Sequence, residues 1–222
     1  MLLIVDQKPR RGESYADSFH WMGVLALSYK PIEALGKLSP AVGAVLIVEP
    51  DTLPDTKDYL SRVRSLCRDI PVFSLSETPP CDGERFADCF GTSGYTSTYL
   101  SRMRDACAKA GRRPVGVYRY GGMDISCTEE AVRYKKQSVR VTKTEAMILR
   151  YLFLAFPARV SAEQILGMAY RRDKRPDSAT VRAHVCALNR KLSPILGYRA
   201  VTSERGEGYR MGTPPAPPTL PL

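Results

Sequence analysis

Three short apolar runs in the first half of the chain constrain its fold more than any other feature. They lie at Leu2–Val5 and at residues 42–48 and 70–75, and the stretches between them have the mixed pattern of surface helices. Strands of near-continuous apolar residues are typical of a parallel sheet that helices cover on both faces. The first half of the chain therefore predicts an α/β domain in which strands and helices alternate.

The remaining elements of this half follow from the same alternation. We expect a further strand over residues 24–27, and helices over residues 13–22, 31–37, 55–67 and 97–109. Five strands joined in this way form a flavodoxin-like doubly wound domain, whose functional residues gather at the carboxyl ends of the strands. We assign this domain to residues 1–110, and a linker to residues 111–116, which are rich in helix breakers.

The second half contains an amphipathic helix over residues 179–192. Its apolar residues Val181, Val185, Leu188 and Leu192 recur at spacings of four, three and four, which places them along one helical stripe. The opposite face carries Arg182, Ala183, Cys186, Ala187, Asn189 and Arg190. Small residues let a helix backbone approach a DNA groove, and long polar side chains reach bases and phosphates, so this face predicts a DNA-reading helix.

A hairpin is expected after this helix. Residues 205–210 read Arg-Gly-Glu-Gly-Tyr-Arg, and two glycines that flank one residue between strand-like stretches predict a tight turn. Arg205 lies at the tip of this turn. Arginine is favoured in the minor groove of DNA by the negative potential there.

Positive charge is concentrated in the same half. Residues 116–222 contain 18 Lys and Arg against 9 Asp and Glu, whereas residues 1–115 contain 15 against 14. A basic domain joined to a neutral one is expected when only one of the two contacts a polyanion.

Residues 118–211 resemble the effector domain of OmpR/PhoB-type response regulators. In that family a strand and a Leu-Thr-x-x-Glu-like turn open the first helix, matched here by residues 141–145. The residues in register with the family's recognition helix and wing are Thr180, Val181, His184, Leu188, Lys191, Leu192, Arg205, Gly206, Gly208 and Tyr209. The resemblance implies an α+β winged helix-turn-helix domain over residues 117–212, and the proline-rich residues 213–222 are expected to form a disordered tail.

The resemblance also implies contacts with double-stranded DNA. The side chains expected to make them are Thr180, Arg182, His184, Cys186, Asn189, Arg190, Lys191, Arg205, Arg172, Lys174 and Arg175. The loop over residues 171–178 can contact RNA polymerase in the family, and its four cations also suit DNA phosphates. Asp177 or Ser178 should cap the helix that follows, and His184 either donates to a phosphate or packs inside the domain.

The first half resembles the receiver domain of the same family, with departures at the phosphorylation site. Asp6 is followed by Gln7 where the family has a second acid, Glu49 stands in place of the phosphoacceptor aspartate, and Ser93 replaces a lysine. Ser76 keeps the expected hydroxyl group. A neutral amide weakens a Mg²⁺ site, and one extra methylene misplaces the attacking oxygen. The pattern indicates a degenerate receiver that accepts no phosphoryl group, with Asp51 as the alternative acceptor.

The segment between Ser76 and Phe90 is shorter than in the family and contains Pro79, Pro80 and Gly83. Because proline opposes helix continuation, we expect the helix here to be one turn or absent. The dimer face of the family would then be remodelled.

Hydropathy and cysteine usage point to a cytoplasmic protein. No apolar run of 18 or more residues exists, so we expect no membrane contact. The six cysteines form no Cys-x-x-Cys pair, so we expect no metal and no cofactor. Reduced thiols are expected, and a redox sensor that uses Cys81 and Cys89 is the alternative.

Together these features predict a sequence-specific transcription regulator, not an enzyme, that binds DNA as a homodimer without phosphorylation. Two alternatives stay open: a phosphorylation switch that uses Asp51, and an adaptor that binds polymerase or another regulator. An unidentified ligand or protein effector also stays open.

Overall fold

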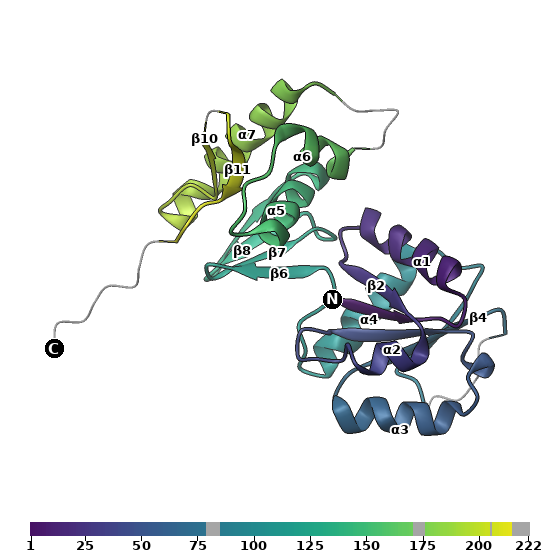
Figure 1. Ribbon diagram of the computed structural model, residues 1–222. Helices are drawn as coiled ribbons and strands as arrows, with labels where there is room; N and C mark the ends of the chain where they lie inside the picture. The colour runs from purple at the N-terminus through teal and green to yellow at the C-terminus, as the bar shows by residue number, and fades with distance from the viewer. Residues whose placement is uncertain (79–84, 171–175, 205, 215–222) are drawn as a thin grey trace. The chain divides into compact units, whose positions relative to one another are not determined.

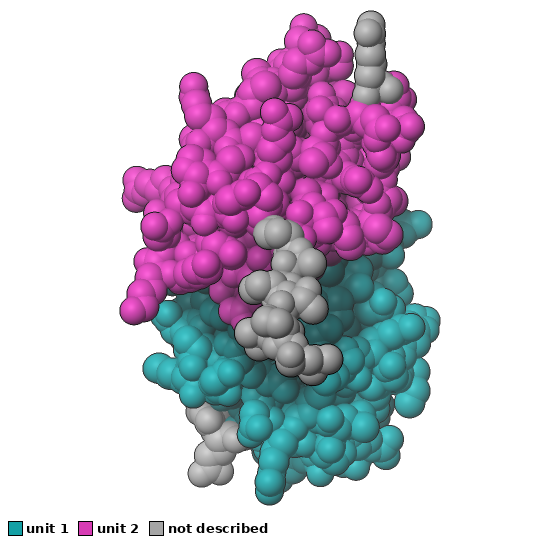
Figure 2. All heavy atoms as spheres, turned by 90° about the vertical axis from the view of Figure 1, so that its left-hand side faces the viewer, with its two compact units in different colours: residues 1–116 teal, residues 117–222 magenta. Residues whose placement is uncertain are grey.

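The computed structural model of the chain describes residues 1–78, 85–170, 176–204 and 206–214. The chain divides into two compact units, residues 1–116 and residues 117–222, which Figure 2 colours separately. None of the helices in the described ranges is long and apolar enough to span a bilayer.

Unit 1, residues 1–116, is built on a parallel sheet of five strands (Figure 1). In the order of the sheet they are β2 (Ala26–Tyr29), β1 (Leu2–Val5), β3 (Ala44–Val48), β4 (Val72–Ser76) and β5 (Asp88–Gly91). The chain leaves β1 toward one edge of the sheet and β3 toward the other, so the β1–β3 pair is the topological switch point of a flavodoxin-like sheet. The predicted fold class is confirmed for this unit.

Two helices cover each face of this sheet. They are α1 (Pro9–Trp21) and α4 (Thr96–Lys109) on one face, and α2 (Pro31–Leu35) and α3 (Thr56–Leu66) on the other (Figure 1). Prolines in the first turn, where no backbone donor is needed, suit the starts of α1 and α2. The carboxylate of Asp55 caps α3, because it accepts the backbone N–H of Asp58 at 2.9 Å.

The first helix and the second strand occupy other residues than predicted. The first helix begins at Pro9 rather than at residue 13, since the fixed φ of proline suits a first turn. The second strand occupies Ala26–Tyr29 rather than residues 24–27, because its pairing with β1 sets Ala26 opposite Leu2.

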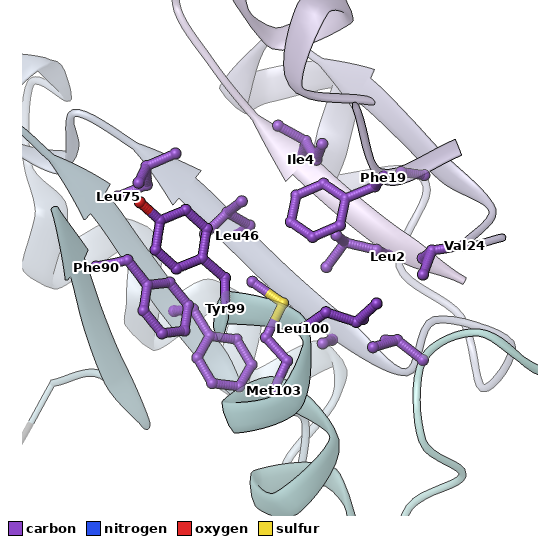
Figure 3. Packing of buried hydrophobic residues seen from close by; sticks show 14 of the residues in the cluster. Leu2, Ile4, Phe19, Val24, Leu46, Leu75, Phe90, Tyr99, Leu100 and Met103 are labelled. Atoms are coloured by element: carbon purple, nitrogen blue, oxygen red, sulfur yellow. The ribbon is translucent and has the colours of Figure 1, made fainter. Parts of the chain in front are cut away.

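Aromatic side chains anchor the core on the α1–α4 face of the sheet. Phe73 of β4 stacks on Phe90 of β5 with ring centroids 5.6 Å apart. Phe90 stacks in turn on Tyr99 of α4 at 4.7 Å, and Met103 of the same helix lies beside them (Figure 3). Dense packing of this kind makes the sheet a rigid platform for the side chains at its carboxyl edge.

The connection between β4 and β5 shows no helix in its described residues, 77–78 and 85–87. Residues 79–84, which include Cys81, lie outside the described residues. The shortened helix therefore stays a prediction for that segment.

Unit 2, residues 117–222, is an α+β winged helix (Figure 1). It opens with an antiparallel sheet of β6 (Val117–Tyr120), β7 (Met123–Ser126), β8 (Ala131–Tyr134) and β9 (Gln137–Arg140). The helices α5 (Lys143–Ala155), α6 (Ala162–Ala169) and α7 (Ser178–Leu196) follow, and the hairpin of β10 (Val201–Glu204) and β11 (Gly208–Met211) forms the wing. The winged-helix prediction is confirmed, whereas the individual strands of the opening sheet were not predicted.

Side-chain caps set the starts of the three helices of unit 2. Thr142 and Glu145 form a capping box at α5, and Ser161 and Gln164 form one at α6. Asp177 caps α7 by accepting a backbone N–H at 3.2 Å. The predicted apolar stripe of α7 is buried, with each of its four residues at most 5% exposed.

Candidate nucleic-acid interface and acidic site

The outward face of α7 carries two exposed arginines beside small side chains. Arg182 and Arg190 are exposed, as are Ala183 and Cys186 between them. Within the described ranges, neither arginine has an ion-pair or hydrogen-bond partner. The two lie about 12 Å apart along the helix axis, and the small residues leave the backbone between them open to a groove.

Asn189 does not face outward as predicted. Its amide nitrogen donates to the carbonyl oxygen of Val201 at 2.8 Å, and its amide oxygen accepts the N–H of Val201 at 3.0 Å. Both bonds join α7 to β10. These two bonds favour a structural role for Asn189, whose side chain positions the wing against the helix, over the predicted DNA contact.

Lys191 is also directed into the domain. Its Nζ lies 2.6 Å from Oε2 of Glu145, whose side chain is 3% exposed. The same oxygen accepts the N–H of Thr142 at 2.7 Å. Burial alone would raise the pKa of Glu145, but the hydrogen bonds from Lys191 and Thr142 outweigh it and leave the pKa lowered. This ion pair favours a structural link between α7 and α5 over the predicted phosphate contact of Lys191.

His184 and Thr180 each have a partner inside the unit. Nε2 of His184 lies 2.7 Å from the hydroxyl oxygen of Tyr170, a contact that favours the packed alternative for this histidine. The Thr180 hydroxyl donates to Oδ1 of Asp177 at 3.2 Å, within the cap of α7. Four other predicted DNA contacts, Arg172, Lys174, Arg175 and Arg205, lie outside the described residues.

The wing is anchored to the segment that precedes α6. Val160 and Tyr209 exchange two backbone hydrogen bonds of 2.8 and 2.9 Å. Gly208 permits this approach, because its φ is 101° and a Cβ atom there would lie 2.3 Å from the carbonyl oxygen of Val160. Arg159, which directly precedes Val160, forms ion pairs with Glu204 and with Glu207.

In unit 1, an arginine of α1 occupies the acidic site at the switch point. Arg11 donates from Nε to Oδ2 of Asp6 and from Nη2 to Oδ1, both at 2.8 Å. Asp6 is 1% exposed and also accepts the N–H of Lys8 at 2.8 Å. The hydrogen bonds to Asp6 raise the pKa of Arg11. Both oxygens of Asp6 are therefore bonded to a permanent cation.

Arg11 also approaches Glu49, with Nη1 and Oε1 4.0 Å apart. Glu49 follows β3 in the left-handed conformation, with φ 48° and ψ 67°, and its Oε1 accepts the N–H of Glu77 at 3.3 Å. That backbone conformation costs a side-chain-bearing residue about 1–2 kcal/mol, so the surrounding contacts must hold it. Arg11 and Glu49 together tie the ends of β1, β3 and β4.

Among the described residues, no side-chain hydrogen bond or ion pair links the other predicted residues of this site to Arg11 or Asp6. Gln7, Asp51 and Ser93 are exposed, and the Ser76 hydroxyl donates to the carbonyl oxygen of Thr78 at 2.8 Å. Mg²⁺ needs several free oxygen ligands, so the bonding of Asp6 to arginine does not fit this ion. Across the described ranges, no three His, Cys, Asp or Glu side chains are grouped so that they could hold a metal ion.

Comparisons with known proteins give a family match within the second unit and further matches to parts or nearly all of the chain. The family model described as "Transcriptional regulatory protein, C terminal" matches residues 136–211. The two-component response regulator PhoP of Pseudomonas aeruginosa is 27% identical over 89 residues, which are 40% of this chain and 40% of PhoP. The family match agrees with the OmpR/PhoB-type resemblance of the second unit.

Solved structures that are similar to this chain cover one or both of its units. The C-terminal domain of the nisin resistance regulator NsrR is 27% identical, with 42% of this chain and 93% of that chain covered and a TM-score of 0.38. The response regulator DrrB, a Thermotoga maritima OmpR/PhoB homologue, is 15% identical, with 96% and 98% covered and a TM-score of 0.40. The match to PhoP spans about two fifths of that relative's length.

Three residues that shape these sites were missed from the sequence: Arg11, Glu145 as the partner of Lys191, and Arg159. The Thr-x-x-Glu spacing signalled the capping role of Glu145, but its second partner lies 46 residues away. A cation five residues after Asp6, at the start of a helix, was the available signal for Arg11. Nothing in the local sequence marks Arg159 as a partner of the wing.

The described cysteines of the chain are free thiols. Cys67, Cys107 and Cys127 are buried, Cys89 is half-buried and Cys186 is exposed. Burial raises the pKa of Cys127 to about 12. The redox alternative stays a prediction, because Cys81 lies outside the described residues.

A hollow of about 360 Å³ lies between α2 and α3. Ile32, Leu35, Leu53 and Tyr59 give it a mainly apolar lining, with Lys30 among its polar residues. This volume suits a small organic molecule. The unidentified effector stays a prediction, and this hollow is its candidate binding site.

Proposed function

We propose that this regulator binds DNA sequence-specifically and controls transcription, with α7 inserted in the major groove. The observation that carries the proposal is the outward face of α7. There Arg182 and Arg190 have no partner within the described residues, and the side chains between them are small. The forked donors of arginine suit both the acceptor edge of guanine and the phosphate backbone.

The charge distribution supports the same partner. The half of the chain that contains the winged helix carries 18 Lys and Arg against 9 Asp and Glu. A basic surface of this kind steers a domain toward a polyanion and makes its binding dependent on salt. The regulator then acts through binding, with no chemical reaction of its own.

The proposal includes a homodimer on paired half-sites and activity in the cytoplasm. A single reading helix contacts only a few base pairs, so regulators of this kind commonly place two helices one helical turn of DNA apart. RNA polymerase is a further partner, suggested by the family resemblance of residues 171–178 alone.

Binding independent of phosphorylation is supported by the pairing of Arg11 with Asp6. A permanent guanidinium group, held at 2.8 Å from both oxygens of Asp6, supplies the positive charge that this edge of the sheet needs. Glu49 is held by Arg11 and by the N–H of Glu77. Unit 1 is on this account a degenerate receiver, fixed in one state by its own ion pair.

The second candidate is a phosphorylation switch that uses Asp51. The specific observation in its favour is that Asp51 is exposed in the short 3-10 helix η1 (Pro50–Thr52), directly after the end of β3. Against it, Asp51 stands apart from the Arg11–Asp6 pair in the contacts described.

Selection of bound fragments from a random DNA pool, followed by gel-shift titration, tests the proposal. Arg182→Ala and Arg190→Ala should each weaken binding to the selected site, and the one that contacts a base should lose about 1–3 kcal/mol of discrimination. As a control, Arg68→Ala removes the same charge from an exposed turn of unit 1 and should leave the affinity unchanged. Unchanged affinity in both helix variants would remove α7 as the reader.

A further inference from the structure

The wing carries two acidic side chains close to its turn. Glu204 ends β10 and lies opposite Gly208, and Glu207 precedes β11. Their side chains are 56% and 57% exposed, so both are accessible to solvent and to a bound partner. Carboxylates in this place oppose the approach of a polyanion.

Arg159 pairs with both of these carboxylates. Its Nε lies 3.1 Å from Oε2 of Glu207, and its Nη1 pairs with Oε2 of Glu204. One guanidinium group therefore bridges the two sides of the hairpin turn. Its side chain is 27% exposed, which is half the exposure of either acid.

The backbone holds Arg159 in this place. The next residue, Val160, exchanges two hydrogen bonds with Tyr209 of β11, and Gly208 lets the two chain segments approach closely. The backbone hydrogen bonds between Val160 and Tyr209 thus place Arg159 beside the wing. Its position does not depend on the ion pairs alone.

Such half-exposed ion pairs contribute little to folding stability, typically less than about 1 kcal/mol. Their contribution to DNA affinity is expected to be larger than their contribution to stability, because a polyanion repels each carboxylate that has no cationic partner.

We propose that Arg159 is a positioning residue for DNA binding, which neutralises Glu204 and Glu207 and holds the wing turn so that it can approach the DNA backbone. The inference rests on the proposed function, in which the winged helix binds DNA. Arg159 acts through the two acids and does not itself contact a phosphate.

Gel-shift titrations of the full chain on its selected DNA site, with a set of four proteins, test this. Arg159→Ala should weaken binding about tenfold at low salt, with a smaller loss at high salt because ions screen the exposed carboxylates. Glu204→Gln with Glu207→Gln should bind at least as tightly as the parent. Adding Arg159→Ala to that pair should have little further effect.

The combined variant distinguishes neutralisation from direct contact. If Arg159→Ala weakens binding equally with and without the two glutamates, Arg159 contacts DNA itself and the inference is overturned. Unchanged affinity in Arg159→Ala overturns it too. The double variant Glu204→Gln with Glu207→Gln tests the inference even if Arg159→Ala fails to fold. Weaker DNA binding by this double variant than by the parent contradicts the inference.

Failure of the proposed function gives a different pattern. A parent chain that selects no DNA site removes both the function and the inference. A parent whose affinity falls on Arg182→Ala but not on Arg159→Ala keeps the function and loses only the inference.

Discussion

Arg11 and Asp6 form a two-pronged ion pair at the carboxyl end of β1, with both N–O distances at 2.8 Å. The side chain of Asp6 is buried and that of Arg11 is 30% exposed, so the arginine lies between the carboxylate and solvent. The pair gives the buried carboxylate of Asp6 a permanently charged partner within the chain.

Arg11→Met should destabilise unit 1, because it leaves the buried charge of Asp6 without its partner. We expect a loss of about 2–3 kcal/mol in the free energy of unfolding, less than for a fully buried pair since Arg11 is partly exposed. Urea titration measures it. Arg10→Ala, at an exposed position of the same helix, should change stability by less than about 0.5 kcal/mol. Equal losses of stability in the two variants would show that the Arg11–Asp6 pair does not stabilise unit 1.

The Glu145–Lys191 pair should make the stability of unit 2 depend on pH. Because the folded-state pKa of Glu145 is lowered, its contribution is fully present above the ordinary value of 4.5 and is lost as the pH falls through the lowered value. Glu145→Gln should therefore flatten the fall of the melting temperature between about pH 5 and pH 3. Glu13→Gln, at an exposed position of α1, should leave that fall as it is.

Asn189→Ala should loosen the wing without changing which sequence is read. It removes two hydrogen bonds to Val201, so we expect about 1–2 kcal/mol less stability and weaker binding to all DNA sites alike. Repeating the selection with this variant measures the second effect. A changed consensus sequence would return Asn189 to the set of base-reading residues.

Gly208→Ala should disrupt the anchoring of the wing, whereas Gly206→Ala should be milder. Both glycines have positive φ, but a Cβ at Gly208 meets the carbonyl oxygen of Val160 at 2.3 Å, and one at Gly206 meets nothing within 4 Å. We expect Gly206→Ala to cost about 1 kcal/mol and Gly208→Ala at least twice that. Thermal unfolding of both variants checks the order, and a reversed order would contradict the anchoring described.

Periodicity predicted the parts of the structure that burial alone decides. The buried stripe from Val181 to Leu192 and the apolar strands of unit 1 follow from it, since apolar side chains are stabilised by burial in the core. Polar side chains at partly exposed positions were harder to place. Asn189 lies on a face that a helical pattern marks as outward, yet a strand 12 residues later comes within its reach.

Arg11 illustrates the same limit in unit 1. Its pairing with Asp6 depends on a helix that begins at Pro9, four residues before the predicted start. A one-turn error at a helix end was therefore enough to hide the cation of the acidic site. The sequence indicated that Gln7, Glu49 and Ser93 depart from the pattern of the family it resembles, but it did not indicate that Arg11 pairs with Asp6.

DNA affinity measured with and without acetyl phosphate and Mg²⁺ tests whether binding is independent of phosphorylation, with the intact mass recorded on the same samples. We expect an unchanged mass and the same affinity for the selected site before and after treatment. A hydroxylamine-sensitive phosphoryl adduct on Asp51, accompanied by tighter DNA binding, would contradict it.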